Sequence, residues 1–176
     1  TVTIIGNSAF GDCPKLTEVK LSKGLTGIGH SAFQQCEILS DISLPENLTT
    51  IGDSAFEDCT GLTDVVFSNS LTEIGWSAFS GCTGLTDITL PKNLQIMESR
   101  AFENCTNLQK VFIPASLKDD GSNGGWGSNA SLGYHSWGPF YGCSSLNDVT
   151  FEEGITNISS YLFAGCTGLR SVAIPD

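Results

Sequence analysis

Hydrophobic positions recur along this chain with a period of 23 residues, and the phenylalanines show it most clearly. The phenylalanine column consists of Phe10, Phe33, Phe56, Phe79 and Phe102, then Phe140 and Phe163. Neighbours in it are 23 residues apart, except that Phe102 and Phe140 are 38 apart, one period plus an insertion of 15. An alanine, a cysteine and a Leu-x-x-Val-x-Leu segment keep the same register around each phenylalanine, with few exceptions. Self-similarity at this period indicates a stacked repeat architecture.

Each repeat contains two segments that predict short elements. The Leu-x-x-Val-x-Leu segment, as in Leu16 to Leu21, ends in the alternation typical of a strand with one buried face. Proline often follows this segment, where its missing N–H ends strand pairing, at Pro45, Pro91, Pro114 and Pro175. The other half of the unit, such as residues 25–33, is too short for a long helix and contains Gly29. There we expect a short strand and then a helical turn around Ala-Phe.

One repeat cannot bury its own apolar side, but repeats stacked about 4.8 Å apart can form a continuous core of identical layers. We therefore predict one domain over residues 1–176, a curved parallel solenoid of about seven repeats, the first and last incomplete. Because the chain opens inside a repeat, end caps, an export signal or an anchor are expected to lie outside it. Residues 118–139 are interpreted as an insertion loop between repeats five and six.

The repeat motif resembles that of a known family. It reads I-G-x-x-A-F-x-x-C-x-x-L and stands as Ile51-Gly52-Asp53-Ser54-Ala55-Phe56-Glu57-Asp58-Cys59-Thr60-Gly61-Leu62. This is similar to the BspA-like, or Treponema-type, leucine-rich repeat, over nearly the whole chain outside the insertion. The resemblance implies a right-handed β-rich superhelix of the α/β leucine-rich-repeat class, with parallel concave strands and short helical turns. The motif weakens at residues 97–100 and in repeat six, where His135, Ser136 and Pro139 occupy its columns.

The same resemblance implies a role. Proteins of this family are secreted or displayed on the surface of host-associated bacteria and some parasitic protists, and are associated with adhesion to host matrix proteins such as fibronectin and fibrinogen. We therefore expect an extracellular or cell-surface module that binds a host protein. Two alternatives stay open: a carbohydrate-binding module that uses the insertion loop, and a structural spacer that binds nothing.

The composition of the chain argues against several classes of partner and function. A formal net charge of −11 with eight Lys plus Arg disfavours nucleic acid and anionic membranes, because both need clustered cations. No run of about 18 apolar residues is present, so we expect no membrane-spanning segment. The histidines, His30 and His135, lie on distant repeats, and no serine-elbow, H-E-x-x-H or phosphate-loop motif occurs. We expect no enzyme and no cofactor.

The seven cysteines all occupy one column, at Cys13, Cys36, Cys59, Cys82, Cys105, Cys143 and Cys166. An exported chain would favour disulfides, but side chains of one column point the same way, into the core. We therefore predict a ladder of buried free thiols, with disulfides between neighbouring rungs and a metal site as alternatives. A metal is the weaker alternative because no histidine lies in or beside the column.

Polar positions on the predicted strands form one candidate binding surface. The position before the Val/Ile column carries Glu18, Asp41, Asp64, Asp87, Lys110, Asp148 and Ser171. Its four successive carboxylates would form an acidic stripe whose like charges repel. The stripe suits a basic partner or a bound cation such as calcium, or it consists of solvated charges that keep the repeat soluble. The position after that column places Val66 and Phe112 on the same face as exposed candidates for an interface.

The insertion is the second candidate. It contains Trp126, Tyr134 and Trp137, half of the chain's six Trp and Tyr residues, among many Gly, Ser and Asn. Aromatic residues on such loops suit protein hot spots or sugar stacking. Alternatively the rings fold back and seal the gap in the stack, an interpretation favoured for Trp137 because it shares a repeat column with Trp76. The predicted binding residues are Trp126, Tyr134, Trp137, Phe112, Val66, Asp41, Asp64 and Asp87.

Overall fold

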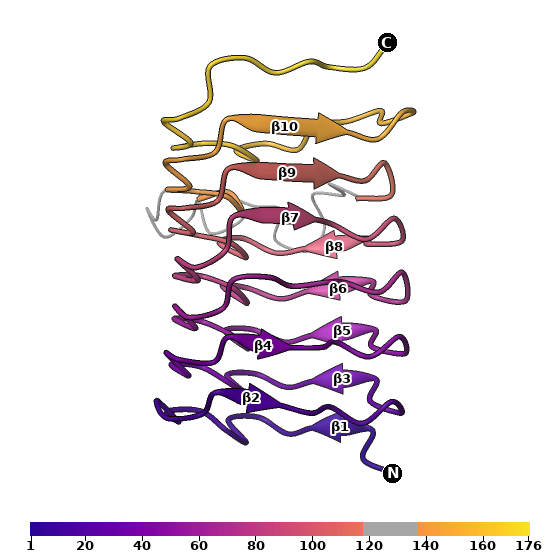
Figure 1. The fold of residues 1–176 in the computed structure, drawn as a ribbon. Helices are drawn as coiled ribbons and strands as arrows, with labels where there is room; N and C mark the ends of the chain where they lie inside the picture. Colours follow the sequence, from indigo (N-terminus) through magenta and orange to yellow (C-terminus); the bar gives the residue numbers. More distant parts are fainter. Residues whose placement is uncertain (118–136) are drawn as a thin grey trace, which may run out of the picture.

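The chain folds as a right-handed coil of stacked rungs, one rung for each repeat (Figure 1). This computed structural model describes residues 1–117 and 137–176. The N-terminus lies at one end of the stack and the C-terminus at the other, so successive rungs are neighbours in space. This arrangement confirms the predicted repeat solenoid with parallel strands.

Two sets of parallel strands lie on opposite sides of the core, one behind the other in Figure 1. One is a five-stranded sheet in the order β1 (Ile4–Ile5), β3 (Gly27–Ile28), β5 (Thr50–Ile51), β6 (Glu73–Ile74) and β8 (Ile96–Met97). Opposite lie β2 (Glu18–Val19) paired with β4 (Asp41–Ile42), and a sheet of β7 (Asp87–Thr89), β9 (Lys110–Ile113) and β10 (Asp148–Phe151). Residues 64–67 follow the same path without a regular strand. We call this second side the strand face.

The phenylalanine column forms the centre of the core. Phe33, Phe56, Phe79, Phe102 and Phe140 are fully buried, and successive rings stack with centroids 5.1 to 5.7 Å apart from Phe10 to Phe163. Interplanar angles between these rings are 5 to 18°. A ring of one rung therefore covers the ring of the next, and no rung buries its phenylalanine alone.

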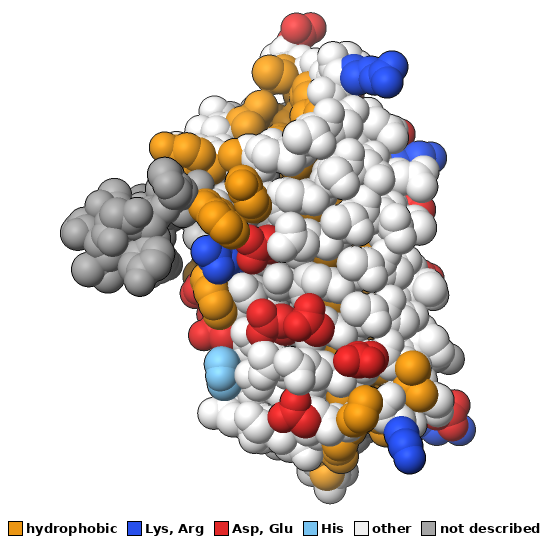
Figure 2. Space-filling model, turned by 90° about the vertical axis from the view of Figure 1, so that its left-hand side faces the viewer, with side chains coloured by type: hydrophobic (Ala, Val, Ile, Leu, Met, Phe, Trp, Pro, Cys, Tyr) orange, Lys and Arg blue, Asp and Glu red, His pale blue; other side chains and the backbone are white. Residues whose placement is uncertain are grey.

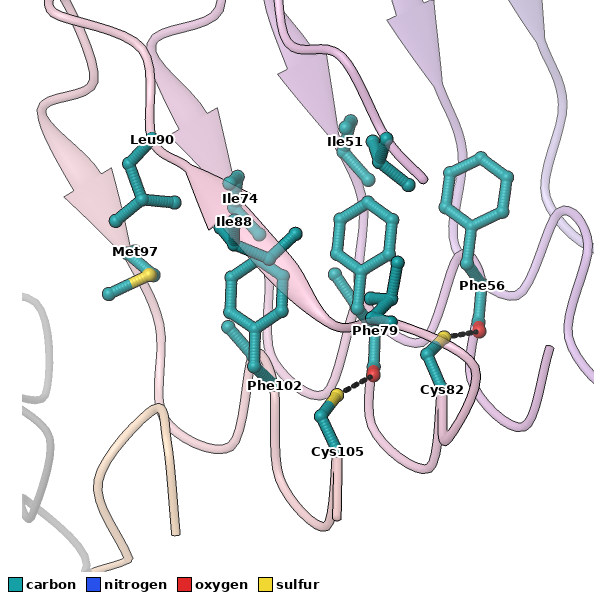
Figure 3. Packing of buried hydrophobic residues seen from close by; sticks show 14 of the residues in the cluster. Ile51, Phe56, Ile74, Phe79, Cys82, Ile88, Leu90, Met97, Phe102 and Cys105 are labelled. Atoms are coloured by element: carbon teal, nitrogen blue, oxygen red, sulfur yellow. Dashed lines mark hydrogen bonds between the residues drawn. The ribbon is translucent and has the colours of Figure 1, made fainter. Parts of the chain in front are cut away.

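The cysteines form the predicted ladder of free thiols (Figure 3). Each thiol from the second rung onward donates to the carbonyl oxygen of a phenylalanine in the preceding rung, as Cys82 does to Phe56 at 3.1 Å and Cys105 to Phe79 at 3.2 Å. Burial raises the pKa of the Cys59 thiol to about 12. These thiols stay protonated, and the hydrogen bond satisfies a polar group in an otherwise apolar core.

The helical turn predicted around Ala-Phe is wrong, because the described residues contain no helix. Each of these turns except the one around Phe140 instead places a residue on both sides of the phenylalanine in the left-handed region, as with Ser54 at φ 53° and Asp58 at φ 58°. Every second amide donates to the next rung: Phe56 N–H bonds to the oxygen of Ala78 at 2.8 Å. Amides committed to a neighbouring rung cannot build the i to i−4 ladder of a helix. We call this side of the stack the Ala-Phe edge.

The stack continues across the insertion without a break. The Phe102 N–H donates to the oxygen of Pro139 at 2.8 Å, and the Phe102 and Phe140 rings stack 5.4 Å apart. The paired strands β9 and β10 align Lys110 with Asp148. Residues 137–139, at the end of the predicted insertion, therefore already contribute to the sixth rung. The weakened motif at residues 97–100 also keeps its register, with Met97 level with Ile74.

The Glu152 side chain links three rungs of the stack close to the insertion. Its carboxylate accepts a hydrogen bond from the Ala115 N–H at 3.0 Å and forms an ion pair with Lys92 at 3.1 Å. The hydrogen bond from Ala115, followed by the contact with Lys92, holds the pKa of this carboxyl below its usual value of 4.5. Since the folded carboxyl is the stronger acid, it contributes stability above its unfolded pKa and loses it as the pH falls through the folded pKa.

We expect Glu152→Gln to lower the free energy of unfolding at neutral pH and to have little effect in acid. Urea titrations between about pH 3 and about pH 7 measure the difference between wild type and variant. Glu153→Gln, the same charge change on the exposed neighbour, is the control. A pH-independent difference would show that the contacts of Glu152 do not stabilise this junction.

Candidate functional site

Most of the polar residues predicted to lie on the strand face are exposed to solvent. Glu18, Asp64, Asp87 and Asp148 are exposed, and Val66 is 72% exposed as predicted. The backbone register aligns Glu18 with Asp41, and it places Lys110 between Asp87 and Asp148. The lysine interrupts the run of carboxylates, so the face is acidic without being uniform. The binding role of these residues stays a prediction.

Phe112 departs from the expectation of an exposed ring, because it is half-buried. Its strand, β9, has a partner on each side, and Thr89 and Thr150 lie level with Phe112 in the register. Val66 lies where no regular strand forms, and its side chain stays open. Within residues 1–117 and 137–176, no group of three or more His, Cys, Asp or Glu side chains is placed to hold a metal ion.

Trp137 is a predicted binding residue that the structure places among side chains that were not predicted to bind. Trp126 and Tyr134 lie outside the described residues. The Trp137 ring stacks on Tyr141 with centroids 4.4 Å apart, and the Arg100 guanidinium carbon lies 4.4 Å from the same ring's centroid. Arg100 also lies 5.7 Å from the centroid of Trp76. We call these four residues the aromatic-arginine cluster.

The repeat geometry explains how the cluster forms. Trp76 and Trp137 occupy the same column two rungs apart, on the Ala-Phe edge, and Arg100 lies on the rung between them. Arg100 replaces the left-handed serine of earlier rungs, such as Ser77, and adopts the same conformation at φ 60°. The guanidinium is thereby held between two indole rings, a geometry in which cation–π attraction contributes about 0.5–2 kcal/mol for each ring.

Carboxylates surround the cluster. The backbone N–H of Trp76 donates to Asp53 Oδ1 at 3.0 Å, and Glu103 Oε2 lies 3.9 Å from Arg100 Nη1. Burial raises the pKa of the Glu103 carboxyl, while Arg100 opposes that shift. Burial also raises the pKa of Glu98, and the negative charges of Asp53 and Glu73 raise it further. The one arginine of the cluster is therefore outnumbered by acidic groups near it.

This side of the molecule combines hydrophobic and charged surface (Figure 2). Hydrophobic side chains form a band along one border of the view, with a basic side chain within it and acidic side chains beside it. Trp76 is 41% exposed and Tyr161, on the seventh rung, is 55% exposed. Large, rigid aromatic side chains beside charged groups are typical of the residues that dominate protein interfaces.

Sequence reasoning missed three members of the cluster: Trp76, Arg100 and Tyr141. Trp76 and Tyr141 stand in columns whose other members are mostly smaller and polar, and Arg100 follows four serines in its own column. The signal was available in the alignment of repeats, because a bulky side chain in a polar surface column has no role in the core. The contact of Arg100 with Trp137 could not be predicted in the same way, because it forms only when the rungs on either side of the insertion stack directly on each other.

The stacked rungs with their leucine, cysteine and phenylalanine columns define a leucine-rich-repeat protein, a class that indicates a protein-interaction module. The family model for the BspA type leucine-rich-repeat region matches residues 3–124 and 131–176 in six copies. The chain belongs to this family, which is defined by its repeat rather than by a catalytic motif.

Two solved structures agree with this assignment. The chain is 31% identical to the T. pallidum leucine-rich repeat protein, with a TM-score of 0.76 over 96% of this chain and 72% of that one. It is 30% identical to a leucine-rich repeat protein from Bacteroides ovatus, with a TM-score of 0.80 over 99% of this chain but 41% of that one. No curated protein matches the sequence. Across the described residues, no helix is long and apolar enough to cross a membrane.

Proposed function

We propose that this chain is a secreted or cell-surface adhesion module that binds a host extracellular protein through its Ala-Phe edge. The observation that carries the proposal is the aromatic-arginine cluster, in which Arg100 is held between Trp76 and Trp137 on the outside of a rigid stack. Membership of the BspA type family supports the adhesive role and the surface location.

The cluster suits binding because its side chains are already ordered. Trp137 is held by Tyr141 and Arg100, and Arg100 by Glu103, so little rotamer entropy is lost when a partner covers them. The rungs beneath are joined by backbone hydrogen bonds and stacked rings, which keep the surface in place. An ordered aromatic surface of this kind provides affinity that scattered apolar residues do not.

The direct test is binding of the purified chain to immobilised fibronectin and fibrinogen, with a glycan panel in parallel. We expect a host protein to bind, and Trp76→Ala to weaken that binding about tenfold or more. Val66→Ala on the strand face is the matched control, because it also truncates an exposed apolar side chain. Circular dichroism and urea unfolding establish that both variants are folded.

Other outcomes favour the alternatives. Binding to glycans with no binding to host proteins would favour a carbohydrate-binding module. Binding to neither would favour a structural spacer. Binding of a host protein by Trp76→Ala as tightly as by wild type would place the binding surface away from the aromatic-arginine cluster. A loss confined to Val66→Ala would move the binding surface to the strand face, where Asp64 and Asp87 also lie.

A further inference from the structure

We propose that the Trp76 end of the aromatic-arginine cluster is a docking site for a basic side chain, an arginine or lysine on an extended segment of the protein partner. This inference rests on the proposed protein-binding function and specifies the chemistry of the partner. It concerns the ring of Trp76 and the carboxylates of Asp53, Glu73 and Glu98.

The Trp76 ring is suited to a second cation. It is 41% exposed, whereas Trp137 is half-buried and already contacts both Tyr141 and Arg100 at 4.4 Å. Arg100 lies 5.7 Å from the Trp76 centroid, so the molecule itself shows a guanidinium near this ring. Indole is the aromatic side chain that attracts cations most strongly.

The carboxylates beside Trp76 supply the opposite charge. Asp53 is exposed and accepts a hydrogen bond from the backbone N–H of Trp76 at 3.0 Å. Glu98 follows β8 directly, one rung beyond Gly75, and both Glu98 and Glu73 are partly exposed. The pKa of Glu98 is raised by its burial and then by the charges of Asp53 and Glu73, so these groups are close enough to repel one another. A cation bound among them would relieve that repulsion.

Charge complementarity decides between possible occupants. The chain carries a formal net charge of −11, and Arg100, the described cation that lies over this ring, is already engaged by Glu103 and two indole rings. An anionic partner would therefore meet repulsion that no free cation among the described residues of this cluster opposes. A neutral sugar would stack on the ring and donate hydroxyl hydrogen bonds to the carboxylates, but it brings no charge to relieve their mutual repulsion. A basic segment uses both features and is drawn in by the long-range field.

A short peptide of alternating arginine and serine is the probe. Its affinity for the chain is measured by isothermal titration calorimetry, beside a peptide with citrulline in place of arginine and one with glutamate. Binding is repeated at about 0.05 M and about 0.5 M salt to reveal the electrostatic contribution. We expect the arginine peptide to bind, the citrulline and glutamate peptides to bind much more weakly, and salt to reduce the affinity.

Two acidic pairs on different faces give a matched comparison. The double variant Asp53→Asn with Glu98→Gln removes two charges beside Trp76. Asparagine suits position 53, because Asn7 in the same column accepts the equivalent hydrogen bond from the backbone N–H of His30. Asp64→Asn with Asp87→Asn removes the same charge from the strand face. We expect the double variant beside Trp76 to bind the arginine peptide about threefold to tenfold more weakly than wild type. The double variant on the strand face is expected to change the affinity by less than about twofold. Trp76→Ala is expected to weaken it about tenfold.

The inference is overturned if both double variants lose the same affinity for the arginine peptide, because equal losses indicate a general attraction of the peptide to a negatively charged protein. It is also overturned if the citrulline peptide binds as well as the arginine peptide, if Trp76→Ala binds like wild type, or if no arginine peptide binds. Should those failures occur while a host protein still binds through Trp76, the proposed adhesive function stands and only the basic partner is wrong. Arginine-peptide binding without host-protein binding would contradict the adhesive function instead.

Discussion

Replacing Phe79 with alanine is expected to lower the free energy of unfolding by about 3–5 kcal/mol, a large fraction of the stability of a domain of this size. Phe79 is fully buried and stacks on Phe56 and Phe102 at 5.1 and 5.2 Å, and its ring meets Phe67 edge-on at 5.7 Å. Alanine leaves a cavity that the rungs cannot close, because hydrogen bonds between rungs fix their spacing. Urea unfolding followed by circular dichroism measures the loss.

Phe10→Ala provides the internal comparison at the end of the stack. Phe10 is 42% exposed and its one stacked neighbour in the column is Phe33. Its removal is expected to cost about 1–2 kcal/mol, because less apolar surface returns to water. Equal losses for Phe10 and Phe79 would contradict a core in which each ring depends on the rings of both neighbouring rungs.

Gly52→Ala is expected to cost about 1–3 kcal/mol by overpacking. A Cβ atom added at Gly52 would lie 2.9 Å from the carbonyl carbon of Gly29 and 2.9 Å from the nitrogen of His30, so the backbone of one rung must shift. Gly6 occupies the same column in the first rung, where an added Cβ meets nothing within 4 Å. Gly6→Ala should therefore change stability by less than about 0.5 kcal/mol.

The comparison of Gly52 and Gly6 separates close packing from backbone flexibility. Both substitutions reduce the conformational freedom of the unfolded chain in the same way. A similar effect in both variants would show that the glycine column serves the turn itself rather than the approach of one rung to the next.

Most of the fold could be predicted from the sequence because every rung repeats the same physical problem. Phe56, Cys59 and Leu62 recur in register, and a column of apolar side chains can be buried only if the rungs stack. The thiol ladder followed from the same reasoning, since all the cysteines share one column. The hydrogen bonds from these thiols to phenylalanine carbonyls depend on backbone geometry that no side-chain pattern reveals.

The turns were mispredicted for a specific reason. Apolar spacing around Ala55 and Phe56 is compatible with a helical turn, but the backbone amides there bond between rungs. The left-handed residue before the phenylalanine is serine in the first four rungs, and the one after it is Asp, Asn or Gly in most rungs, types that tolerate this conformation. Their periodic placement was visible in the sequence and would have indicated a non-helical turn.

The candidate site was predicted only in part. Alternation along the strands predicts the exposed columns of the strand face, and the aromatic composition of the insertion predicts Trp137 as a binding residue. The link between Trp137 and Arg100 crosses from one rung to the next over an insertion, so it depends on the direct packing of Phe102 against Phe140. Neither spacing nor composition specifies that contact.

Photo-cross-linking from opposite faces of the stack tests most directly whether the chain binds a host protein through its Ala-Phe edge. A benzophenone side chain is introduced at His30, an exposed position in the column of Trp76, or at Val66 on the strand face, and each variant is irradiated with fibronectin and with fibrinogen. We predict a cross-linked product from position 30 and none from position 66. A product from position 66 alone, or from neither position with either protein, would contradict the assignment.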